Sequence, residues 1–157
     1  MSESSDAVDR AALVADRLAI ADLVHAYAQG VDRLDPEAVG RLFTEDGTFV
    51  AYATPGAEEP TSRSEGRAAV TKAIGMARHY RQTTHTIGNH LADVQGDSAT
   101  GETRCVAFHV LGDEGAETLL VWHIRYLDTF ARRPEGWRFS ERVLRVDLAY
   151  DQPLHRA

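Results

Sequence analysis

A histidine and an aspartate in this chain are placed where they could move a proton together. His85 lies in Thr83–Val94, where apolar and polar residues alternate, and such alternation predicts a β-strand. Alternate residues of a strand point to the same side, so His85 shares a face with Ile87, Asn89 and Leu91. The apolar members mark this face as the inner one, and we therefore expect His85 and Asn89 to point toward the core.

Asp32 comes at the end of a helical pattern whose inward stripe includes Tyr27 and Val31. The negative end of the helix dipole and burial both disfavour a charged carboxylate there, and a neighbouring imidazole would offset that cost. Elimination of water needs a base for the C–H proton and an acid for the leaving hydroxyl group. A histidine held by an aspartate can carry that proton, so the pair predicts acid–base chemistry.

Further polar residues fall on expected inner faces of later strands. Parity places His109 on the core side of its strand, although the opposite face is also apolar. Leu120 and Trp122 share a face with other large apolar residues, and Arg142 alternates with Leu144. The strands that carry these residues are expected at Ala99–Leu111, Glu117–Phe130 and Trp137–Leu148.

Helices are expected to precede these strands. A first helix begins at Asp9 with Gly30 as its stop signal, and Asp35-Pro36 starts a second. Ser64 is expected to cap a third helix over 66–79. Between the second and third helices we expect a strand at Thr48–Tyr52 and a loop over 53–65. The order predicts an α+β fold with helices on one face of a curved antiparallel sheet.

The composition excludes several classes of protein. The 157 residues carry a net charge of −7, so neither nucleic acid nor an anionic membrane is expected as a partner. The acidic, polar N-terminus differs from a signal peptide, and a lone cysteine, Cys105, suits a reducing compartment, so we expect a cytoplasmic protein. His85 and His90 point to opposite faces and no nucleotide-binding motif occurs, so we expect neither a metal nor a cofactor.

Several short motifs occur in an order that resembles the nuclear-transport-factor-2-like (NTF2-like) superfamily, and within it the SnoaL-like group. That group includes scytalone dehydratase, bile acid 7α-dehydratase, polyketide cyclases and, more distantly, ketosteroid isomerase. The resemblance implies a cone-shaped α+β barrel of three N-terminal helices on a mainly antiparallel sheet, with one domain at 8–150 and tails at 1–7 and 151–157. The motifs are Tyr27–Asp35, Leu42–Gly47, Thr83–Asn89, Gly96–Gly101, Tyr126–Asp128 and Gly136–Arg138 with Arg142.

The resemblance also implies roles for individual residues. Asp32 and His85 fall on the Asp–His pair of the dehydratases, and His109 falls on the second histidine of scytalone dehydratase. Tyr27 and Arg142 fall on a tyrosine and an arginine of the bile-acid enzyme. We therefore expect Asp32, His85, His109 and Tyr27 to be catalytic.

The sequence departs from scytalone dehydratase at positions that assist its reaction. The serine and asparagine of that enzyme would fall near Leu120 and Trp122, and its first-strand tyrosine would fall at Ala51, one residue before Tyr52. These differences argue against scytalone as the substrate. The residues that we expect to bind substrate are Asn89, Arg142, Trp122, Tyr52 and Leu120.

We predict a cofactor-free acid–base enzyme for a hydrophobic polycyclic or aromatic small molecule, most simply a dehydratase. A polyketide cyclase or a ketosteroid-type isomerase would use the same groups, and a non-catalytic binding or dimerisation module is the other class. A homodimer or higher homo-oligomer is expected through the outer face of the sheet. The apolar side chains expected there are Val106, Phe108, Val110 and Val121.

Overall fold

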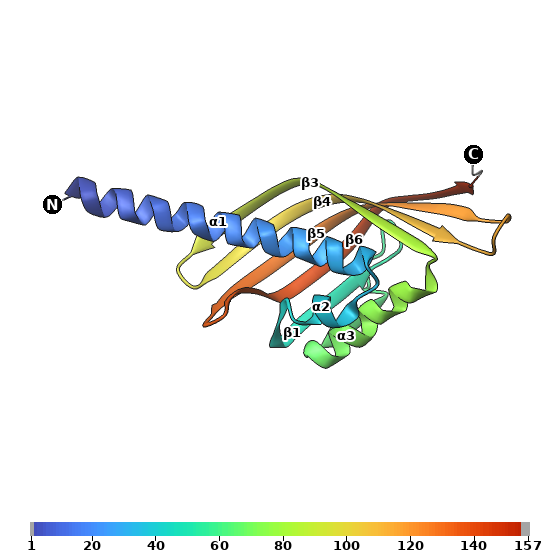
Figure 1. Cartoon of the computed structure of the whole chain (residues 1–157), viewed down its shortest axis with the longest axis horizontal. Coiled ribbons are helices and arrows are strands. Elements are labelled where there is room, and N and C mark those ends of the chain that lie inside the picture. Colours follow the sequence, from blue (N-terminus) through green and yellow to red (C-terminus); the bar gives the residue numbers. More distant parts are fainter. Residues whose placement is uncertain (1, 155–157) are drawn as a thin grey trace.

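Six strands form one mixed sheet in the computed structural model, and helices pack against one of its faces (Figure 1). Residues 2–154 are described, with side chains from residue 9 onward. The helices are α1 (Ser2–Asp32), α2 (Pro36–Gly40) and α3 (Arg67–Gly75), which a 3₁₀ turn, η1 (Met76–His79), follows. The strands are β1 (Phe43–Tyr52), β2 (Ser62–Glu65), β3 (Gln82–Gln95), β4 (Ser98–Leu111), β5 (Thr118–Arg133) and β6 (Gly136–Pro153).

Helix α1 is longer than predicted at both ends. It begins at Ser2 instead of Asp9, so the expected tail at 1–7 is helical as far as it is described. It continues past Gly30 to Asp32, because Gly30 serves a close helix contact instead of a stop. A Cβ atom on Gly30 would lie 2.6 Å from Cγ2 of Val39 in α2. The glycine therefore lets α1 and α2 touch, and Asp32 is the last helical residue.

The segment between the second and third helices contains more sheet than predicted. Strand β1 starts at Phe43, before the expected Thr48. Part of the expected loop is β2, which pairs with β1 and contains Ser64. The predicted helix cap at Ser64 is therefore wrong: Gly66 is the N-cap of α3, without a side-chain hydrogen bond.

The four long strands are confirmed in place, and the sheet order is β2-β1-β6-β5-β4-β3. Strands β1 and β6 pair in parallel, and the other neighbours pair antiparallel. Strands β2 and β3 form open edges, so the sheet curves without closing into the expected barrel. Strand β6 also extends to Pro153, into the residues expected as a C-terminal tail; residues 155–157 of that tail lie outside the described part.

A bulge in β3 reverses the predicted inward face of its second half. The pairing of β3 with β4 shifts between Ile87 and His90. Beyond the shift His90 faces inward, where its Nδ1 lies 2.9 Å from the Thr103 hydroxyl. The prediction that Asn89 and Leu91 face the core is wrong, since Asn89 is exposed and Leu91 is 81% exposed. The extra residue of a bulge accounts for this change of parity.

A second irregularity, between β5 and β6, turns Leu148 outward, where it is 51% exposed, although simple alternation would give it the inward face of Leu144 and Val146. The outer patch expected from four apolar residues is also different from the prediction. Val110 and Val121 are buried within the chain itself.

None of the described helices is long and apolar enough to cross a membrane.

Candidate active site

Asp32 and His85 meet at the point where the end of α1 reaches β3. Oδ1 of Asp32 lies 2.6 Å from Nδ1 of His85, and Oδ2 accepts the backbone N–H of the same histidine at 2.8 Å. Thr83, two residues earlier on the same face of β3, donates its hydroxyl to Oδ1 at 3.0 Å. The carboxylate is therefore fixed by three contacts. The carboxylate can only accept a hydrogen bond, so the imidazole carries its proton on Nδ1. Its Nε2 is then free to accept a proton.

The surroundings of Asp32 keep it charged. Burial alone would raise the pKa of its carboxyl group. Hydrogen bonds from the ring and backbone of His85, and from Thr83, outweigh burial and lower the pKa below its ordinary value. The His85 side chain is only 6% exposed, whereas the Asp32 side chain is 26% exposed, so water reaches the carboxylate but hardly the imidazole. The charged carboxylate orients the imidazole and stabilises the imidazolium that forms when Nε2 takes a proton.

A second histidine stands beside the first. The ring centroids of His85 and His109 are 5.9 Å apart, with the rings nearly perpendicular. His109 is 4% exposed, and its ring also contacts Trp122 at 4.9 Å and Tyr80 at 4.4 Å. Burial, with a smaller contribution from His85, lowers the pKa of His109 to about 4. This imidazole is therefore neutral at pH 7, and its Nδ1 has no hydrogen-bond partner among the described residues.

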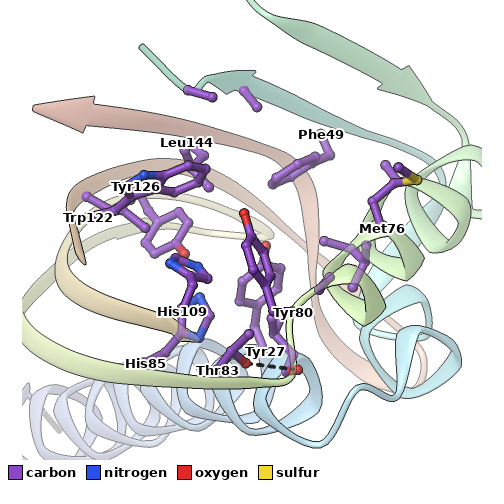
Figure 2. A pocket seen from close by; sticks show the side chains of 17 residues that line it. Tyr27, Phe49, Met76, Tyr80, Thr83, His85, His109, Trp122, Tyr126 and Leu144 are labelled. Carbon is purple, nitrogen blue, oxygen red and sulfur yellow. Dashed lines mark hydrogen bonds between the residues drawn. The ribbon is translucent and has the colours of Figure 1, made fainter. Parts of the chain in front are cut away.

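Both histidines line a cavity of about 210 Å³ between the helices and the concave face of the sheet (Figure 2). Most of its wall consists of apolar side chains, such as Val31, Phe49 and Ile74. Its polar side-chain groups come from three tyrosines, one threonine, the two histidines and the indole of Trp122. None of the described residues that line it is a lysine, arginine, aspartate or glutamate. The cavity can therefore surround a neutral apolar molecule and offer it a base.

Arg142 was expected to bind substrate, and it faces inward, but it is not among the residues that line the cavity. Its guanidinium is fully buried and donates two hydrogen bonds, of 2.8 and 2.7 Å, to the carboxylate of Asp128. The aromatic rings of Tyr27 and Tyr126 each lie 4.1 Å from this guanidinium. Tyr27 itself lines the cavity, and burial raises the pKa of its hydroxyl group.

The structure brings some of the expected site residues together and leaves others out. Asp32, His85, His109, Tyr27 and Trp122 belong to the cavity wall or to its support. Asn89, Leu120, Tyr52 and Arg142 do not line the cavity. Asn89 is turned outward by the bulge, and the ring of Tyr52 packs against the guanidinium of Arg145 on the other face of β1.

Sequence reasoning missed two groups of the site. Thr83 has the parity of His85, so alternation could have indicated it. Tyr80 follows η1 in a segment without periodicity, so no sequence pattern could have placed it. The described residues contain no group of three or more His, Cys, Asp or Glu side chains that could hold a metal ion.

The family profile of the SnoaL-like domain matches residues 12–143. The chain belongs to the SnoaL-like family. An uncharacterized protein of Mycobacterium tuberculosis, Rv2910c, is 28% identical over 132 residues, which are 83% of this chain and 84% of that protein.

Solved structures agree with this assignment. An NTF2-like protein from Novosphingobium aromaticivorans is 26% identical, with 93% and 91% of the two chains covered and a TM-score of 0.72. The hexachlorocyclohexane dehydrochlorinase LinA-type3 from Novosphingobium barchaimii is 19% identical, with 94% and 93% covered and a TM-score of 0.71. This SnoaL-like chain therefore has the NTF2-like fold, which the motifs in its sequence predicted.

Proposed function

We propose that this chain is a cofactor-free lyase that removes a proton from a neutral one- or two-ring molecule and expels a hydroxyl group. The observation that carries the proposal is the Asp32–His85 pair, which presents Nε2 of an oriented imidazole at the wall of an apolar cavity. A base in such a place acts on a C–H bond away from competing water. The dehydrochlorinase LinA-type3, whose solved structure resembles this chain, is named for the removal of hydrogen chloride. Loss of hydrogen chloride and loss of water are both eliminations, so that enzyme offers an analogy in reaction class.

Two properties of the cavity limit the substrate. An apolar cavity of about 150 Å³ holds benzene, so the 210 Å³ of this cavity suits one or two rings instead of the larger polycycles. Among the described residues of the wall there is no cation that could pair with a carboxylate or phosphate, and Arg142 is buried against Asp128. A charged substrate would lose its hydration there without compensation.

The proposed base can be tested with 5-nitrobenzisoxazole, a neutral two-ring molecule. The base removes the proton on C3, the only C–H of the isoxazole ring. The C–H electron pair forms a nitrile as the N–O bond breaks, and the product is a coloured phenolate, so absorbance follows base catalysis directly. We expect His85→Ala to lower turnover about 10²–10⁴-fold, the usual contribution of a positioned base. Asp32→Asn should also be slow, and the double variant little slower than the slower single one, because the two residues act as a unit.

His25→Ala is the matched control, since His25 is exposed on α1 and lies outside the cavity. This variant should turn over the probe at the wild-type rate. Melting temperatures of all variants show whether they are folded. A folded His85→Ala protein whose turnover stays within a few-fold of wild type would refute the proposed base.

A further inference from the structure

Tyr80 brings a phenol group to the same cavity from the helical side. It is the C-cap of η1, and its backbone N–H donates to the carbonyl of Ala77 at 3.0 Å. Its ring stacks on His109, with centroids 4.4 Å apart and an angle of 41° between the planes. His109 in turn contacts His85, so Tyr80 and the proposed base lie against one imidazole ring (Figure 2).

The other hydroxyl groups of the cavity wall are less suited to give a proton to a ligand. Thr83 donates its hydroxyl to Asp32. Tyr27 and Tyr126 are buried in the core, at 2% and 1% exposure, with their rings against the Arg142 guanidinium. The hydroxyl of Tyr126 also has no hydrogen-bond partner among the described residues, but it is fully enclosed by protein. Tyr80 is only half-buried, and its hydroxyl has no hydrogen-bond partner among the described residues. Burial raises its pKa, so the phenol keeps its proton at neutral pH.

We propose that Tyr80 is the proton donor to the leaving oxygen in the elimination that His85 begins. This inference rests on the proposed function, because an acid is needed only if a base forms the double bond. An elimination requires both groups within reach of one substrate. The contacts Tyr80–His109 and His109–His85 place a phenol and an imidazole on adjoining parts of one small cavity.

The proton balance of the step is complete without another reactant. Nε2 of His85 takes the proton from carbon, the C–H electron pair becomes the second bond of C=C, and the C–O bond breaks with its electron pair on oxygen. The hydroxyl group of Tyr80 gives its proton to that oxygen, and water leaves. The proton on His85 then returns to the Tyr80 oxygen through water, which restores both residues.

The donor can be distinguished from the base by changing the leaving group of the probe. The nitro group of 5-nitrobenzisoxazole stabilises the phenolate that forms, whereas unsubstituted 1,2-benzisoxazole forms a more basic phenolate that depends more on a proton donor. We expect Tyr80→Phe to lower kcat/KM about 10²-fold with the unsubstituted probe. With the nitro probe the loss should stay within about threefold, because the better leaving group needs little protonation.

The matched control is Tyr150→Phe, which removes a hydroxyl group from a 46% exposed tyrosine outside the cavity. It should match wild type with both probes. Tyr80→Phe keeps the ring that stacks on His109, so its melting temperature should also match wild type. Equal losses with the two probes, or no loss with either, would overturn the role of Tyr80 while leaving the His85 base intact. Turnover that does not depend on His85 would overturn the proposed function and this inference with it.

Discussion

The buried, neutral state of His109 predicts how the stability of the protein depends on pH. The pKa of this imidazole falls from 6.5 to about 4 on folding, because burial opposes its charge. The unfolded chain therefore takes up a proton at a higher pH than the folded chain does. His109 has no effect on stability at a pH above its pKa in the unfolded chain. Stability is lost as the pH falls from about 6.5 toward 4. From these two values, roughly 2 kcal/mol should be lost between pH 7 and pH 5.

The effect of His109 can be separated from other titrating groups by a double comparison. Urea unfolding, followed by tryptophan fluorescence, gives the free energy of unfolding of wild type and His109→Gln at both pH values. The glutamine does not titrate, so the difference between the two proteins should change by roughly 2 kcal/mol in favour of the variant at pH 5. His109→Asn should behave in the same way. A difference that stays constant within about 0.5 kcal/mol would show that His109 is not held neutral in the folded protein.

Four other outcomes follow from the structure. Asp128→Asn should lower the free energy of unfolding by about 3–5 kcal/mol in urea titrations, because it leaves the Arg142 charge buried without its partner; a loss below 1 kcal/mol would contradict this. Ala73→Leu should fill part of the cavity and raise KM for 5-nitrobenzisoxazole several-fold, and an unchanged KM would place binding elsewhere. Turnover should survive dialysis against a chelator, and recovery only after adding a divalent ion would disprove a cofactor-free reaction. Light scattering at micromolar concentration should give a homodimer mass, and a monomer would count against pairing through the exposed Leu91, Leu148 and Tyr150.

Alternation along the strands predicted much of the fold and the centre of the candidate site. Hairpin turns and the period of two were enough to place the four long strands and to turn His85 and His109 inward. Alternation failed for Asn89, because a single extra residue in a strand reverses every side chain beyond it and leaves no clear sign in composition. The resemblance to the family predicted Asp32 as the partner of His85, and local pattern alone could only show that this carboxylate needed one.

The role of Arg142 could not be decided from its own strand. Parity turned it inward correctly, yet its partner Asp128 lies directly opposite on β5, and that pairing depends on the register between two strands. Asp128 has the same parity as Tyr126, so an inward carboxylate could have been noticed. Tyr80 could not be predicted for a different reason. It lies in a short irregular segment, where the position of a side chain depends on how α3 packs and not on a periodic sequence pattern.

The bulge of β3 divides this strand into two stretches of opposite parity. His85 belongs to the first stretch, and the inward residues Ala92 and Val94 belong to the second. In a related chain without the extra residue, every second side chain would point inward along the whole strand. Aligned to this chain without a gap, it would match His85 correctly but would set its core residues against the exposed Leu91 and Asp93. Low identity beyond the bulge is therefore a poor guide to whether a relative shares the Asp–His pair, and a one-residue gap at Gly88 or Asn89 restores the comparison.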